Sequence, residues 1–80
     1  MTIGTYLKQC RELEGVTQED LAMYLGLSSP QYISNVERGY CKPTTKRLPV
    51  WCDYIGANRK KVLAILSMDY NNKVKRELGI

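Results

Sequence analysis

Four glycines divide this chain into short segments, and their spacing is the feature that most limits what the chain can fold into. Gly15, Gly26, Gly39 and Gly56 each follow a segment in which apolar residues recur at three- and four-residue steps. Such steps place apolar residues on one face of an α-helix. Glycine after such a segment is typical of a helix end, because it adopts the left-handed backbone conformation without strain. The pattern therefore predicts several short helices and no strands.

Helix-start signals stand in front of the same segments. Thr17 and Asp20 resemble a capping box, in which each side chain accepts a hydrogen bond from the other residue's backbone N–H. Ser29 and Pro30 have the order of an N-cap and a first helical residue, where the missing N–H of proline costs nothing. Asn58 marks a later start. The sequence predicts an all-α domain of five helices, at about residues 2–14, 17–26, 29–39, 48–55 and 58–70.

One hydrophobic core is expected, because 80 residues lie near the lower size limit for a single stable domain and 44% of them are hydrophobic. The inner faces of the five predicted helices supply this core. Its predicted members are Ile3, Leu7, Cys10, Leu13, Leu21, Ala22, Leu25, Ile33, Val36, Trp51, Ile55, Val62, Leu63, Ile65 and Leu66.

Charge is distributed unevenly along the chain. The net charge is +4, and ten of the twelve basic residues lie from Arg38 onward. A basic half beside an acidic half indicates a polyanion bound on one side of the molecule. A solvated basic surface without a partner explains the charges equally well.

Three cysteines, Cys10, Cys41 and Cys52, are odd in number and widely spaced, and the chain has no histidine. This pattern fits neither a disulfide framework nor a zinc site, and free thiols suit a reducing cytosol. The longest apolar run, residues 62–66, is too short to span a bilayer. We expect a cytoplasmic protein with no metal, no cofactor, no small-molecule ligand and no membrane partner.

The third predicted helix is unusually polar for the centre of a small domain. Ile33 and Val36 are its only aliphatic residues, whereas Gln31 and Asn35 lie one turn apart toward the other side. An amide side chain carries a donor and an acceptor side by side, which is the arrangement that binds an adenine edge in the major groove of DNA. An ordinary solvent-facing helix is the alternative.

A wider motif surrounds this helix. The segment GVTQEDLAMYLGLSSPQYISNVERG has a Thr-Gln pair, an inner Leu-Ala pair, a glycine at the turn, an isoleucine and a closing Glu-x-Gly, which here are Thr17, Gln18, Leu21, Ala22, Gly26, Ile33, Glu37 and Gly39. The segment resembles the helix-turn-helix of the XRE family, which includes the lambdoid phage repressors and Cro proteins. With RELEG before it and RLPVWCDYIGAN after it, the resemblance covers roughly residues 3–66. Six residues separate Gly26 from Ile33, where the commonest family pattern has five, so the docking angle of the third helix on DNA stays open.

The resemblance implies two sets of DNA contacts. The groove-facing helix would contact bases through Gln31, Asn35, Tyr32 and Ser34. The phosphate-contacting positions would be Gln18, Ser29, Arg38, Tyr40, Lys42, Lys46 and Arg47. Phosphate contacts supply affinity and register, while base contacts set sequence preference. For Lys46 and Arg47 a solvated loop is the alternative.

Arg11 and Glu37 occupy the inner sides of the first and third predicted helices. A lone charge is costly at an apolar position, so two opposite charges at such positions predict a partly buried ion pair that joins the helices. Family members often have such a pair. Two separate surface charges are the alternative.

These features indicate a transcriptional regulator that binds double-stranded DNA at specific sequences. We expect a small repressor that binds a near-palindromic operator. We expect residues 1–70 to form the DNA-binding domain. Residues 71–80 would be a basic tail that extends the last helix or contacts a partner, in a homodimer formed through the fifth helix and the tail. Tyr54, Met68 and Tyr70 are further candidates for that contact. The alternative function is that of an antitoxin-like or adaptor protein that binds a partner protein. The sequence offers no nucleophile with an evident base, so we do not expect an enzyme.

Overall fold

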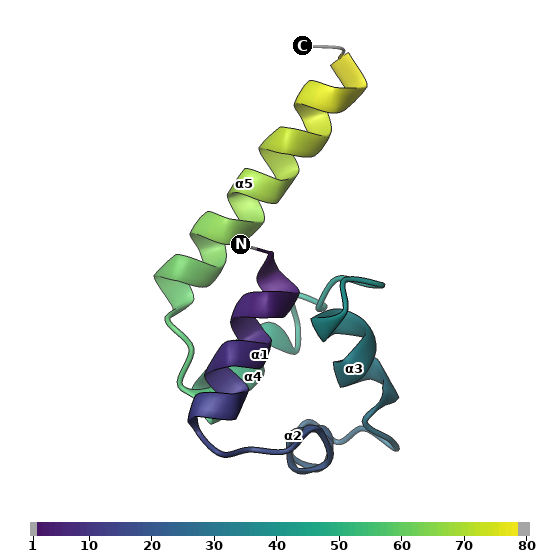
Figure 1. Cartoon of the computed structure of the whole chain (residues 1–80), viewed down its shortest axis with the longest axis vertical. Coiled ribbons are helices and arrows are strands. Elements are labelled where there is room, and N and C mark those ends of the chain that lie inside the picture. Colours follow the sequence, from purple (N-terminus) through teal and green to yellow (C-terminus); the bar gives the residue numbers. More distant parts are fainter. Residues whose placement is uncertain (1, 79–80) are drawn as a thin grey trace.

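A computed structural model describes the backbone of residues 2–78 and the side chains of residues 2–68. Within residues 2–78 the chain forms five α-helices and no strand, so the predicted all-α architecture is confirmed (Figure 1). The helices are α1 (Ile3–Leu13), α2 (Gln18–Tyr24), α3 (Gln31–Glu37), α4 (Leu48–Ile55) and α5 (Arg59–Leu78).

Local capping signals position most of the helix ends. The capping box of α2 is present, with the Asp20 N–H donating to Thr17 Oγ1 at 3.0 Å and the Thr17 N–H donating to Asp20 Oδ2 at 3.4 Å. The Lys61 N–H donates to Asn58 Oδ1 at 3.1 Å at the start of α5. Gly56 ends α4 with φ +68°, a left-handed conformation that a side chain would strain. These three signals are therefore used where the sequence places them.

The start of α3 differs from the prediction, and the end of α5 lies beyond the approximate boundary given above. Pro30 is the N-cap of α3 rather than its first helical residue, because its ψ of 0° is not helical. Ser29 is one residue too early to be the N-cap, although its hydroxyl oxygen accepts a long bond of 3.4 Å from the Gln31 N–H. The helix α5 continues past Tyr70 to Leu78, an extension that the sequence left open; residues 71–78 contain no glycine or proline that would break it.

The core lies where α1 packs against α3, α4 and α5 and where α2 meets α3. Its fully buried side chains are Trp51, Leu7, Leu21, Ile33, Ile55, Val36 and Cys52. Two predicted core residues are instead exposed, Leu13 at 87% and Leu63 at 66%. Leu13 lies two residues after the buried Arg11 and so points to the other side of α1, and Leu63 is turned about 100° from its buried neighbour Val62.

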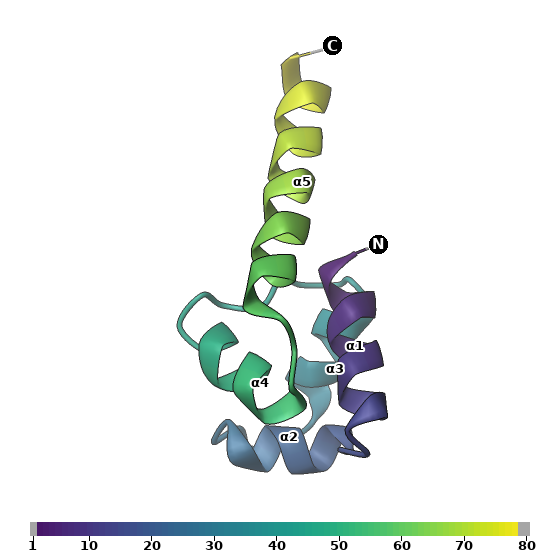
Figure 2. The same ribbon diagram turned by 90° about the vertical axis from the view of Figure 1, so that its left-hand side faces the viewer.

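The overall shape is a globule formed by α1 to α4 and the first half of α5, whose second half projects. In both Figure 1 and Figure 2, the C-terminal half of α5 extends beyond the other helices, and the molecule measures 42 × 23 × 20 Å. At its start, α5 is attached to α1 because the Asn58 N–H donates to the Tyr6 hydroxyl at 3.0 Å. Of the helices in residues 2–78, none combines the length and the apolar character needed to cross a bilayer.

Candidate nucleic-acid interface

A buried network of charged and polar side chains holds α3 against α1. Arg11 Nε donates to Glu37 Oε2 at 2.7 Å, and Arg11 Nη2 donates to Glu37 Oε1 at 3.2 Å. The two side chains are 11% and 2% exposed. Arg11 Nη1 also donates to the Val16 carbonyl at 2.8 Å. The two opposite charges at inner positions of α1 and α3 thus meet as a bidentate pair, the geometry in which such pairs are strongest.

Gln18 connects the first residue of α2 to the same network. Its Nε2 donates to Glu37 Oε1 at 2.9 Å, and its side chain is half-buried. Glu37 therefore accepts bonds from both α1 and α2. The contact fixes the orientation of the Gln18 amide at the N-terminus of α2, the position that the resemblance assigns to the DNA backbone.

Gly4 allows α1 to lie directly on the last turn of α3. A Cβ atom at this position would lie 2.9 Å from the Glu37 carbonyl oxygen and would overlap the Val36 carbonyl oxygen. Only a residue without a side chain fits there. The sequence contains a signal for this approach, because glycine inside a helix costs stability and is kept for a packing reason.

The outer side of α3 presents two amides that bond to each other. Gln31 is exposed and Asn35 is half-buried, and Gln31 Nε2 donates to Asn35 Oδ1 at 2.9 Å. Residues four apart on a helix are surface neighbours, so this bond runs along the helix. Ser34 beside them is half-buried. The structure thus brings three of the four residues predicted to contact bases to one side of α3.

Tyr32, the fourth residue predicted to contact bases, packs inward instead. Its ring is half-buried and packs against the core, with its centroid 6.1 Å from that of Trp51. Its hydroxyl oxygen accepts a hydrogen bond from the Thr44 N–H at 3.0 Å. The Arg47 guanidinium lies over the ring at 5.9 Å from its centroid. Tyr32 is therefore engaged with the connection between α3 and α4.

That connection, residues 38–47, collects most of the predicted phosphate contacts. Arg38, Tyr40, Lys42 and Lys46 are exposed, and Arg47 is half-buried. Pro43 in the middle is buried. Four basic side chains thus follow α3 closely, whereas the other two predicted phosphate contacts, the half-buried Gln18 and the exposed Ser29, lie before it in the chain.

Two short helices joined by a short connection, here residues 25–30, with polar side chains on the outer side of the second helix, are typical of a helix-turn-helix, whose second helix enters the major groove. Here α2 and α3 form this unit, α1 and α4 pack against it, and the start of α5 packs against α1 (Figure 2). A family model described as helix-turn-helix matches residues 7–58. The chain belongs to the XRE-type helix-turn-helix family.

Solved structures of regulators are similar to this chain. Two are structures of the clp gene regulator ClgR from Corynebacterium glutamicum: one is 32% identical with a TM-score of 0.68, covering 81% of this chain and 82% of ClgR. The other is 29% identical with a TM-score of 0.69, covering 94% and 79%. The wild-type restriction-modification controller protein C.Esp1396I is 28% identical with a TM-score of 0.64, covering 85% of this chain and 88% of that protein. A comparison with curated proteins found no match.

The similar structures are thus those of a gene regulator and of a restriction-modification controller. The protein is a DNA-binding transcriptional regulator.

Proposed function

We propose that this regulator represses transcription as a homodimer that occupies a near-palindromic operator in the cytoplasm. The observation that carries the proposal is the amide pair of Gln31 and Asn35 on the outer side of α3. The buried Arg11–Glu37 pair holds that helix from behind. A regulator with this arrangement controls a promoter by occupancy, since α3 lies in the groove that polymerase must also reach.

Base contacts in this proposal come from Gln31 and Asn35, with Ser34 beside them. Amides suit adenine, whose major-groove edge offers an acceptor at N7 and a donor at N6. Phosphate contacts come from Gln18, Ser29, Arg38, Tyr40, Lys42, Lys46 and Arg47. Each phosphate neutralised by a basic side chain releases counterions, so we expect affinity to fall steeply as salt is raised.

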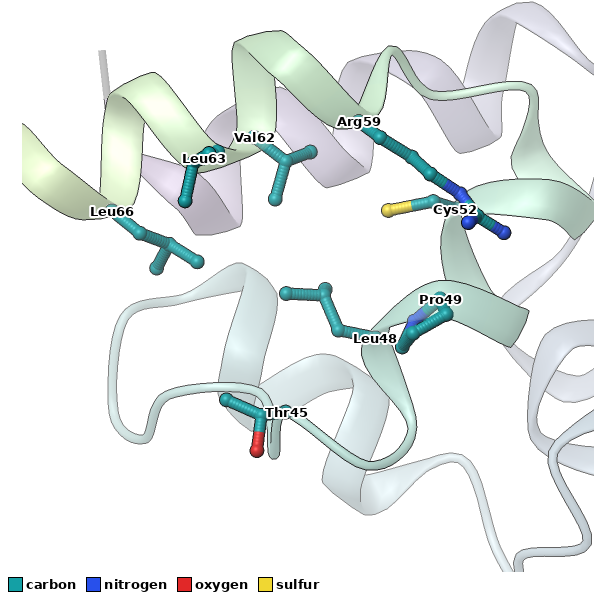
Figure 3. Close-up of a pocket in the computed structure, with 8 residues that line it drawn as sticks. All are labelled: Thr45, Leu48, Pro49, Cys52, Arg59, Val62, Leu63 and Leu66. Carbon is teal, nitrogen blue, oxygen red and sulfur yellow. The ribbon is translucent and has the colours of Figure 1, made fainter.

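A second copy of the chain is proposed to dock on α5. Leu63 and Met68 on this helix are 66% and 63% exposed. A cavity of about 240 Å³ between α4 and α5 adds to this surface, with Leu48, Pro49, Val62, Leu63 and Leu66 among its lining side chains (Figure 3). Exposed apolar surface of this kind is typical of an interface. The side chains of Tyr70 and of residues 71–80, the predicted tail contact, lie outside the described residues.

In the proposed division of the chain, residues 1–70 form the DNA-binding domain and residues 71–80 a basic tail that extends the last helix or contacts a partner. A dimer places its two α3 helices in successive major grooves, roughly 34 Å apart or a multiple of that distance. The operator should therefore have two inverted half-sites.

The experiment that tests the proposal is selection of bound sequences from a random pool of double-stranded DNA. We expect an inverted repeat whose half-sites contain A·T pairs. Gln31→Ala should bind the selected operator more weakly while unfolding at an unchanged temperature. Gln9→Ala is the matched control, because Gln9 is an exposed amide on α1. Indiscriminate binding by the parent protein would contradict the proposal.

A further inference from the structure

Tyr32 and Thr44 connect the proposed base-reading helix to the proposed phosphate-binding loop. Tyr32 belongs to α3, and its hydroxyl oxygen accepts the Thr44 N–H at 3.0 Å. Thr44 lies in the connection of residues 38–47, between Lys42 and Lys46. This bond joins α3 to a loop residue twelve positions further along the chain than Tyr32.

Thr44 is also the residue on which the second half of the loop depends. Its carbonyl oxygen accepts bonds from the Arg47 N–H at 3.2 Å and the Leu48 N–H at 3.1 Å, which lead the chain into α4. The backbone N–H and C=O of one residue therefore attach the loop to α3 and to α4 at once. Fixing Thr44 fixes the backbone from which Lys46 and Arg47 extend.

The ring of Tyr32 makes a second contact with the loop. The Arg47 guanidinium lies over the ring face, 5.9 Å from the centroid, and the ring itself is tilted by 58° against Trp51 of the core. A cation over an aromatic face keeps its N–H groups at the edge, where they can bind phosphate oxygens. The core thus supports Tyr32, and Tyr32 supports Arg47.

We infer that Tyr32 is a positioning residue that holds the cationic loop in register with α3, so that phosphate contacts and base contacts are made together. This inference rests on the proposed DNA-binding site. A loop that is already ordered in the free protein loses less conformational entropy when the complex forms. This increases affinity without adding a contact. The bond from Thr44 uses the Tyr32 hydroxyl only as an acceptor, and the ring contacts Arg47 and the core, so the contacts that Tyr32 makes favour positioning over the predicted base contact.

The test compares Tyr32→Phe, which removes only the hydroxyl, with Tyr32→Leu, which also removes the ring. Tyr24→Phe is the matched control, since Tyr24 lies on α2 and stacks on Tyr54 at 4.1 Å. In DNA-free protein, we expect the Thr44 amide to exchange its hydrogen about tenfold faster in Tyr32→Phe than in the parent or the control.

Binding to the selected operator is then measured against salt concentration. We expect Tyr32→Phe to lower the salt slope by about one, because a loop phosphate contact is lost. Affinities for operator and random DNA should fall by the same factor, so that their ratio is kept. Tyr32→Leu should show a larger loss of slope, because Arg47 loses its support as well.

Three results would overturn the inference. One is an unchanged exchange rate at Thr44. Another is a loss of preference at one base pair with an unchanged salt slope, which would make Tyr32 a base contact. The third is a lower unfolding temperature with unchanged binding, which would make its role structural only. A parent protein that binds no preferred sequence would instead contradict the proposed function, and Thr44 exchange would still decide whether Tyr32 anchors the loop.

Discussion

Gln31 Nε2 donates to Asn35 Oδ1 at 2.9 Å, so the two outermost amides of α3 form one hydrogen-bonded unit. Each amide restricts the rotation of the other. Together they leave an acceptor on Gln31 and the donors of Asn35 Nδ2 for a ligand. Contacts made by such a unit depend on both members.

The first prediction concerns this coupling. Gln31→Ala and Asn35→Ala should each weaken binding to the selected operator by about 1–3 kcal/mol, the usual value of a good base contact. The double variant should lose clearly less than the sum, because the first removal already frees the second amide. Fluorescence anisotropy titrations of the four proteins measure this cycle. Strictly additive losses would show that the two amides act independently.

The second prediction concerns the buried pair of Arg11 and Glu37. Arg11→Met should lower the free energy of unfolding by about 3 kcal/mol, since Glu37 would stay buried without its partner charge. Adding Glu37→Leu should restore much of the loss, because two apolar side chains then face each other. Urea unfolding followed by the fluorescence of Trp51, the only tryptophan, reports both values. A double variant less stable than Arg11→Met would contradict this account.

A third prediction is that Gly4→Ala destabilises the protein by roughly 1–3 kcal/mol, as overpacking does. Helix propensity alone would give the opposite sign, because alanine favours a helix over glycine. The clash is with the carbonyl groups of Val36 and Glu37, so α3 must move and operator affinity should fall as well. Lys8→Ala, at an exposed position of α1, is the control and should leave both quantities nearly unchanged.

Alkaline pH gives a fourth prediction. Burial raises the pKa of the Cys52 thiol above its ordinary value of 9.0, although Arg59 acts in the opposite direction. The folded state therefore holds the proton more tightly than the unfolded chain. The stability that this group contributes is full below pH 9 and is lost as pH rises through the higher folded pKa.

Unfolding temperatures between pH 8 and pH 10 should accordingly fall less in Cys52→Ala than in the parent. Part of the decline should remain above pH 10, because the pKa of Tyr6 is also raised. The hydrogen bond from the Asn58 N–H acts to lower the pKa of Tyr6 from its ordinary value of 10.0. Burial and the neighbouring Cys10 together outweigh this effect, so the pKa lies above that value. Parallel pH profiles for the parent and Cys52→Ala would contradict the assignment.

The fifth prediction tests the surface proposed for dimerisation. Leu63→Glu should convert the dimer to a monomer, because a charge there would be buried against the partner copy. Leu13→Glu is the matched control: Leu13 is also an exposed leucine, but it lies on α1. Sedimentation equilibrium separates the two results. If both variants keep the parent's mass in solution, the second copy does not dock on α5.

The helices could be predicted from the sequence because their signals are local. Thr17 and Asp20 make their capping box within one turn, and Gly56 ends α4 through its own backbone angle. The spacing of apolar residues identified the buried side of each helix. It did not give the width of that side, because the width depends on how many neighbouring helices cover it. For this reason Leu13 and Leu63 were expected inside and lie outside.

In the candidate site, too, some contacts could be predicted from the sequence and others depend on tertiary packing. Arg11 and Glu37 could be matched from sequence because two opposite charges at inner positions have few other partners. The contact between Tyr32 and Thr44 depends on the path of a loop with no periodic pattern. Gly4 could be noticed as a helix-interior glycine, but its neighbour on α3 is a matter of tertiary packing.

The helix α1 touches α3 through Gly4 and the beginning of α5 through Tyr6, only two residues further along. The single helix α1, which also contacts α3 through Arg11, therefore sets the offset between the proposed DNA-facing helix and the helix proposed for dimerisation. Which bases are preferred and how far apart the two half-sites lie would then be encoded in different segments. Such a regulator can acquire a new target sequence by changing α3 while it keeps the same site length.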